Sequence, residues 1–198
     1  MRIRNFTTYI ILALLISISA KSESSRGEIF IANFTKTIFN IISDKEASHD
    51  KILISLTSEI KKNIDLEYIC NFVIGRKWNS ASPEFQQRFM KLYESYLIGL
   101  YAPQFQGYNG ESYKIIKTEE VRTNRFSSQL VFILQNKTQL NITIYFIRNK
   151  NNEFKIVDVT GEGISLLASQ REEFSSIINM YGLDYFIEAF QEKVKQNQ

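Results

Sequence analysis

The sequence contains one cysteine, Cys70, and one histidine, His49, among its 198 residues. A lone cysteine cannot form a disulfide within the chain, and the two together leave little room for a zinc cluster of the usual Cys/His kind. The same counts weigh against a Cys/His or Ser/His/Asp catalytic arrangement. Cys70 lies in an apolar stretch, which predicts a small buried side chain. We therefore expect no metal, no cofactor and no enzymatic activity.

Beyond its first 22 residues, the sequence has no apolar run long enough to span a bilayer. At the N-terminus two arginines precede an apolar run (residues 9–20), and residues 20–22 fit an A-x-S cleavage pattern. This run is shorter than the ~20 apolar residues that a membrane anchor needs. We expect residues 1–22 to be a cleaved signal peptide and residues 23–198 to be one soluble domain in the periplasm.

The chain also lacks an excess of charge once this leader is set aside. The formal net charge is +3, from 24 basic and 21 acidic residues. Arg2, Arg4 and Lys21 lie in the leader, so 21 basic residues remain to balance the 21 acidic ones. Without a basic excess, the sequence offers no electrostatic footprint for nucleic acid.

The first half of the sequence has the periodicity of amphipathic helices. Apolar residues three and four apart predict helices over residues 30–41 and 52–64. Asp65 is placed to cap a short third helix that Gly75 ends. Ser82-Pro83-Glu84 begins the longest helix, with Ser as the cap and Pro in the first turn. The inward stripe of this long helix comprises Phe85, Phe89, Tyr93, Leu97 and Leu100 or Tyr101.

From Tyr113 onward the pattern becomes that of β-strands separated by short polar breaks. Residues 140–146 alternate between apolar and mostly polar side chains, so one face of this strand is apolar. Residues 130–134 are apolar on both faces, which predicts a central strand covered on both sides. Four antiparallel strands in a meander are the economical interpretation.

The C-terminal segment returns to helical spacing. One helix stops at Gly182, and Asp184 is placed to cap a final one. Helices segregated around one antiparallel sheet make an α+β domain.

Three segments carry the most specific motifs. Residues 73–78, followed by residues 80–89, are similar to the pattern LG..W..A.PEQ...F, and residues 97–101 form a leucine-rich turn that ends in tyrosine. Residues 156–166, followed by residues 170–178, match I.DV..EGVSL...QR.EF..I. In this order and spacing, over most of residues 30–195, the segments resemble the MlaC family, also called the toluene-tolerance family. Departures are small: Phe154-Lys155 stands where the family often has tryptophan, and Ile164 replaces valine.

The resemblance implies a nuclear-transport-factor-like fold, in which about six or seven helices wrap a curved four-stranded antiparallel sheet around an apolar cavity. It also implies a function: a monomeric periplasmic carrier that binds the acyl chains of a phospholipid. Such a carrier would shuttle lipid between an inner-membrane ABC transporter complex and an outer-membrane lipoprotein/porin complex, and so maintain the lipid asymmetry of the outer membrane.

We expect the acyl-chain pocket to be lined jointly by the long helix and the sheet. An inward stripe of this kind is more often ordinary core, so the expectation depends on the family resemblance. Trp78, just outside a helix end, either lines the mouth or anchors packing. The expected lining comprises Trp78, Phe89, Tyr93, Leu97, Tyr101, Leu130, Phe132, Leu134, Ile142, Ile144, Phe146, Val157, Val159 and Ile164.

Two other functions stay open. Asp158 with Tyr93 or Tyr145 could act as the base and proton donor of a nuclear-transport-factor-like isomerase or other small-molecule enzyme. We instead expect Asp158 to form a structural salt bridge or hydrogen bond, with Arg76, Arg88 or Arg171 as candidate partners. Gly161-Glu162-Gly163 is interpreted as a tight turn, not a phosphate loop. The second alternative is a periplasmic adaptor that binds only proteins.

Overall fold

The structure is a computed structural model that describes the backbone of residues 4–101 and 112–196. Side chains are described from residue 23 on, except those of His49 and Tyr101. Within these limits, no helix combines the length and the apolar character needed to cross a membrane.

Five strands form one antiparallel meander in the order β1-β2-β3-β4-β5. The sequence predicted four strands, and the fifth is a two-residue strand that places Ser165 opposite Thr160. The hairpin turns fall at the predicted polar breaks, where Asn124, Lys137 and Asn152 take positive φ values. The strands are β1 (Ser112–Arg122), β2 (Arg125–Ile133), β3 (Gln139–Arg148), β4 (Phe154–Gly161) and β5 (Ile164–Ser165).

The helices fall in the predicted blocks, and their caps confirm the local signals. Asp65 accepts a hydrogen bond from the Tyr68 amide at 3.0 Å, Gly75 ends α3 with a φ of 68°, and the Ser82 hydroxyl accepts from Phe85. The helices are α1 (Arg4–Ile42), α2 (His49–Asn63), α3 (Leu66–Ile74), the 3-10 helix η1 (Gly75–Ser80), α4 (Pro83–Tyr101) and α5 (Leu166–Gln196).

Two helix boundaries differ from prediction. The first helix begins at Arg4 and so includes residues 4–22 of the expected leader. The last two predicted helices are joined as α5, which is kinked at Gly182, with φ 84° and ψ 174°. The side chain of Asp184, the predicted cap beyond this kink, forms no hydrogen bond with the described residues.

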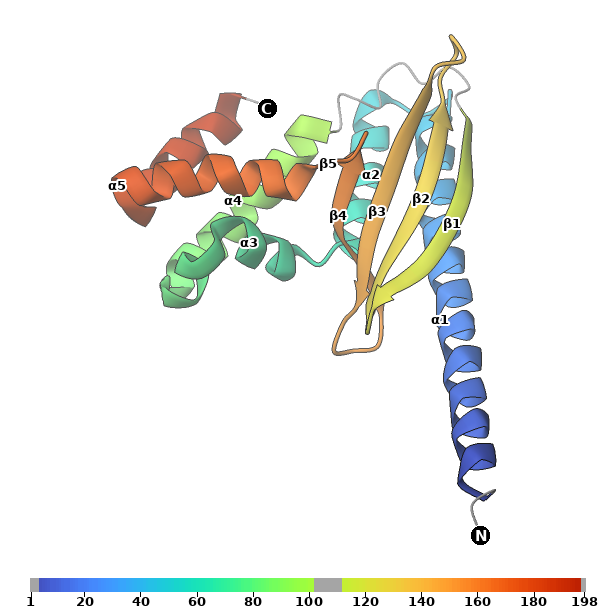
Figure 1. Ribbon diagram of the computed structural model, residues 1–198. Helices are drawn as coiled ribbons and strands as arrows, with labels where there is room; N and C mark the ends of the chain where they lie inside the picture. Colours follow the sequence, from blue (N-terminus) through green and yellow to red (C-terminus); the bar gives the residue numbers. More distant parts are fainter. Residues whose placement is uncertain (1–3, 102–111, 197–198) are drawn as a thin grey trace.

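The elements divide into a sheet unit and a helical unit (Figure 1). In the sheet unit, α1 lies along the sheet and contacts β1, β2 and α2. In the helical unit, α3, α4 and α5 lie beside β4 and contact one another, while α3 and α5 also contact β4. Each unit has a buried apolar cluster of its own.

The middle of α1 is held close to the sheet. A Cβ atom at Gly27 would lie 3.0 Å from the Phe146 ring, so only glycine lets the helix approach this closely. One turn earlier, the Glu23 carboxylate accepts a hydrogen bond from Arg148, the last residue of β3. These contacts orient the apolar face of α1 toward the sheet.

Candidate functional site

The apolar face of the sheet and the facing side of α1 form what we call the sheet layer. Its members come from α1 and from β1 to β4, which present alternate residues to the helix. The buried members are Ile31, Phe126, Leu130, Ile144, Phe146 and Ile156, and the half-buried members include Phe30, Phe34, Tyr113, Ile115, Phe132, Ile142, Phe154 and Val159.

The two ends of the sheet layer differ in burial. At one end Phe126 and Phe146 are each 1% exposed, and their rings stack with centroids 5.3 Å apart. At the other end the half-buried rings of Phe39, Tyr113 and Phe132 contact one another with centroid separations of 4.7, 5.7 and 6.2 Å. The layer is therefore closed at one end and partly accessible at the other.

The second apolar group is the helical cluster, which centres on Phe89 of α4. Six rings surround Phe89 with centroids between 5.4 and 6.3 Å away, and Phe89 and Tyr93 are both fully buried. The Tyr93 hydroxyl donates to the side-chain oxygen of Gln170 in α5. This density of ring contacts is typical of a structural core.

The structure divides the predicted pocket residues between these two groups. Trp78, Phe89, Tyr93 and Leu97 belong to the helical cluster. The sheet layer contains Leu130, Phe132, Ile142, Ile144, Phe146 and Val159. The sequence-based prediction placed the long helix and the sheet around one pocket. The described residues of these elements instead belong to two separate apolar clusters.

Of the four remaining predicted residues, the three whose side chains are described lie in neither group. Val157 is buried and Leu134 is half-buried, but neither belongs to a cluster. Ile164 is 64% exposed on the edge strand β5. The side chain of Tyr101 lies outside the described residues.

Sequence reasoning missed the contribution of α1 and β1 to the apolar site. Phe30 and Phe34 were recognised only as a helical stripe, and Tyr113 only as the start of a strand. Phe39 lies off the predicted stripe. The signal that could have found the α1 residues is the concentration of three phenylalanines, Phe30, Phe34 and Phe39, within one helical segment.

Asp158 forms a joint between β4 and the start of α5. Its carboxylate accepts hydrogen bonds from the Ser165 hydroxyl at 2.6 Å and from the amides of Val159 and Leu167 at 2.8 and 3.3 Å. Ser165 in turn accepts from the Ala168 amide at 2.9 Å. The hydrogen-bonding role was predicted, but the partners were wrong.

The arginines proposed as partners of Asp158 are engaged elsewhere or exposed. Arg88 pairs with Glu188 of α5, and this hydrogen bond lowers the pKa of the Glu188 carboxyl. Arg171 donates to the Phe72 carbonyl. The predicted tight turn at residues 161–163 is confirmed as the connection between β4 and β5.

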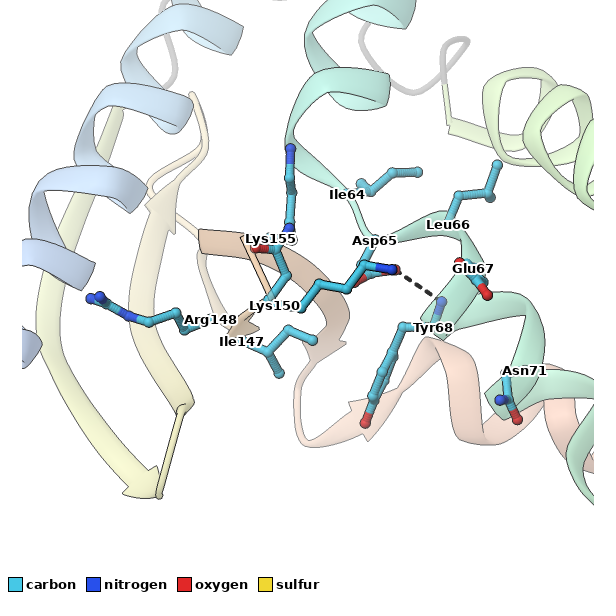
Figure 2. A pocket seen from close by; sticks show the side chains of 11 residues that line it. Ile64, Asp65, Leu66, Glu67, Tyr68, Asn71, Ile147, Arg148, Lys150 and Lys155 are labelled. Atoms are coloured by element: carbon cyan, nitrogen blue, oxygen red, sulfur yellow. Dashed lines mark hydrogen bonds between the residues drawn. The ribbon is translucent and has the colours of Figure 1, made fainter. Parts of the chain in front are cut away.

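Two open grooves lie beside α3 and share Tyr68 and Asn71. The first has a volume of about 540 Å³ and lies between residues 64–71 and the β3–β4 hairpin; Figure 2 shows Lys150 and Lys155 beside it. The second has a volume of about 390 Å³ and lies between α3, η1 and Arg171. Polar and charged side chains make up much of both linings.

Comparisons with known proteins agree with one another. A family model described as MlaC protein matches residues 32–192. The chain is 26% identical to the intermembrane phospholipid transport system binding protein MlaC of Haemophilus influenzae, over 96% of this chain and 91% of that protein. A solved phospholipid-binding protein from Ralstonia solanacearum, in complex with a phospholipid, has the same fold with a TM-score of 0.75 at 17% identity, over 84% of this chain and 96% of that one.

Proposed function

Because this chain belongs to the MlaC family, we propose that it is a carrier that binds the acyl chains of a phospholipid. The relatives support this, since one is named as a phospholipid transport protein and the other was solved with a phospholipid. The observation in this chain that carries the proposal is the partly accessible aromatic end of the sheet layer, formed by Phe39, Tyr113 and Phe132.

The free-energy cost of exposing acyl chains to water shows why a carrier is needed. Two acyl chains contain roughly 30 methylenes, and at ~0.8 kcal/mol each their exposure to water costs on the order of 20 kcal/mol. A lipid therefore crosses an aqueous compartment only if a protein covers its chains. The polar headgroup can remain in water at the mouth of the site.

We place the acyl chains in the sheet layer, entering from its half-buried end. Among the predicted pocket residues, we expect Phe132, Ile142 and Val159 to contact the acyl chains, because each is apolar and only half-buried. Leu130, Ile144 and Phe146 lie deeper in the same layer. Trp78, Phe89 and Tyr93 are assigned to packing, because they are almost fully buried among other rings.

The finer parts of the proposal follow the family resemblance. The carrier is exported by the leader in residues 1–22 and acts in the periplasm as a monomer. It exchanges lipid with an inner-membrane ABC transporter complex and an outer-membrane lipoprotein/porin complex, and so maintains outer-membrane lipid asymmetry.

Native mass spectrometry with lipid extraction, on protein purified from a bacterial periplasm, tests this proposal. The expected result is a monomer that lacks the leader and carries phospholipid in stoichiometric amount. An empty and equally stable protein would contradict the carrier function. That result would favour the adaptor, or an enzyme if turnover of a small substrate were also found.

A further inference from the structure

The second groove beside α3 has a lining unlike that of an acyl-chain site. Its side chains are two arginines, two asparagines and two aromatic residues, and the lining includes no aspartate or glutamate. We refer to it as the arginine groove. It comprises Tyr68, Asn71, Phe72, Gly75, Arg76, Asn79 and Arg171.

Arg171 is held in a fixed position in the arginine groove. One guanidinium nitrogen donates to the Phe72 carbonyl at 2.9 Å, and the group lies 4.9 Å from the centroid of the Phe72 ring. A Cβ atom at Gly75 would lie 3.1 Å from the other terminal nitrogen, Nη2. Glycine at this position therefore makes room for the guanidinium.

Among the side chains that the structure describes, neither arginine forms an ion pair with a carboxylate. Among residues 23–101 and 112–196, the ion pairs use other cations, and none includes Arg76 or Arg171. The Arg171 contacts described above engage a carbonyl and a ring, which leave its positive charge unbalanced. Asp65, in the neighbouring groove, caps the first turn of α3.

The donors in this groove match a phosphate group. A guanidinium presents several N–H groups in a planar fork that fits two phosphate oxygens at once. Asn71 and Asn79 add side-chain amide donors at the same surface. Because one arginine is already fixed, little side-chain freedom has to be lost on binding.

We propose that the arginine groove binds a phosphate ester, either the headgroup of a phospholipid in a membrane surface or a free phosphate ester. The site is separate from the sheet layer and does not depend on acyl-chain binding there. Since Arg76 is exposed, the interaction weakens with added salt.

Titration of the periplasm-purified protein with sn-glycerol 3-phosphate tests the proposal, using NMR shifts of the Gly75 and Asn79 amides. Saturable shifts are expected, together with about fivefold weaker binding in Arg76→Gln. Lys77→Gln is the matched control, because Lys77 is exposed, adjacent and outside the lining. Arg171→Lys tests the fixed arginine without removing charge, and weaker binding is expected there too.

A loss in Lys77→Gln equal to that in Arg76→Gln would overturn the proposal, because it would indicate only a general positive field. Absence of saturable shifts would overturn it as well. A protein that binds glycerol phosphate but carries no lipid would leave this site intact and remove the carrier function instead.

Vesicle sedimentation distinguishes the two sources of phosphate. Vesicles of digalactosyldiacylglycerol, a lipid without phosphate, that contain phosphatidic acid are compared with the same vesicles that contain diacylglycerol with the same acyl chains. Stronger binding to phosphatidic acid that Arg76→Gln reduces assigns the groove to a membrane headgroup. Equal binding to both vesicles, with glycerol phosphate still bound, assigns it to a free phosphate ester.

Discussion

The Ser165 hydroxyl donates a 2.6 Å hydrogen bond to the Asp158 carboxylate. This bond joins the last long strand of the sheet to the residue that caps α5. A second connection is the backbone pairing of Ile64 with Ile156, where the Asp65 amide donates to the Ile156 carbonyl at 3.0 Å. Together, the two connections join the helical unit to the sheet unit. The Asp158 motif therefore sets the position of one apolar cluster relative to the other.

Asp158→Ala should lower the free energy of unfolding by ~1–3 kcal/mol, because the Ser165 hydroxyl and the Leu167 amide both lose their acceptor. Urea denaturation measures the change. Asp184→Ala is the control: this aspartate is exposed and should change stability by less than ~0.5 kcal/mol. Equal effects of the two substitutions would contradict the role of the joint.

Gly75→Ala should cost more stability than Gly163→Ala. Both glycines have positive φ, at 68° and 82°, so both substitutions strain the backbone by ~1–3 kcal/mol. Only at Gly75 does the new methyl group also meet Arg171, whereas nothing lies within 4 Å at Gly163. Thermal unfolding measures the difference. Equal losses of stability in the two variants would mean that the contact with Arg171 adds no cost.

Tyr93→Phe should destabilise the protein by ~1–2 kcal/mol, because it removes the hydroxyl that donates to the buried Gln170 amide oxygen. Adding Gln170→Leu to Tyr93→Phe should recover part of this loss, because it removes the buried side-chain oxygen that Tyr93→Phe leaves without a donor. Tyr185→Phe, at a residue 55% exposed, is the control and should be close to neutral. Additive losses in the double variant would contradict this account.

Stability should fall as the pH rises above ~8.5, the usual pKa of a cysteine thiol. Burial, and secondarily Glu67, raises the pKa of the Cys70 thiol in the folded state. Above ~8.5 the unfolded chain releases this proton while the folded chain keeps it, so the free energy of unfolding decreases by up to ~1.4 kcal/mol per pH unit. Chemical denaturation of wild type and Cys70→Ala across this range isolates the effect, because the variant should lack this part of the slope.

Phe132→Ala should release bound lipid about fivefold faster, corresponding to ~1 kcal/mol of lost acyl contact. Phe85→Ala is a matched control, since Phe85 is also a half-buried phenylalanine but packs against the helical cluster. Native mass spectrometry after timed dilution measures lipid retention in both. Faster release from Phe85→Ala than from Phe132→Ala would place the acyl chains in the helical unit.

Local features were predictable from the sequence because their causes are local. Asp65, Ser82 and Gly75 cap or end helices through atoms only a few residues away. The polar breaks likewise determine where the hairpins turn. The α+β class and the meander followed from these elements.

Packing between distant elements was not predictable in the same way. The stripe of α4 shows which side of the helix is buried, but its period is the same whether that side faces a sheet or other helices. Phe89 and Leu130 were therefore assigned to one pocket although they lie in different clusters. Ile164 belongs to a two-residue strand, which is too short for any pattern to indicate its exposure.

The packing of α1 on the sheet also has a consequence for biogenesis. Phe30 and Phe34 leave the ribosome early, yet the strands that cover them, including Phe146 and Phe154, are made near the end of synthesis. A helix whose partners are so distant in sequence cannot complete its packing until nearly the whole chain is present. During that interval its aromatic face is exposed to solvent and available to chaperones.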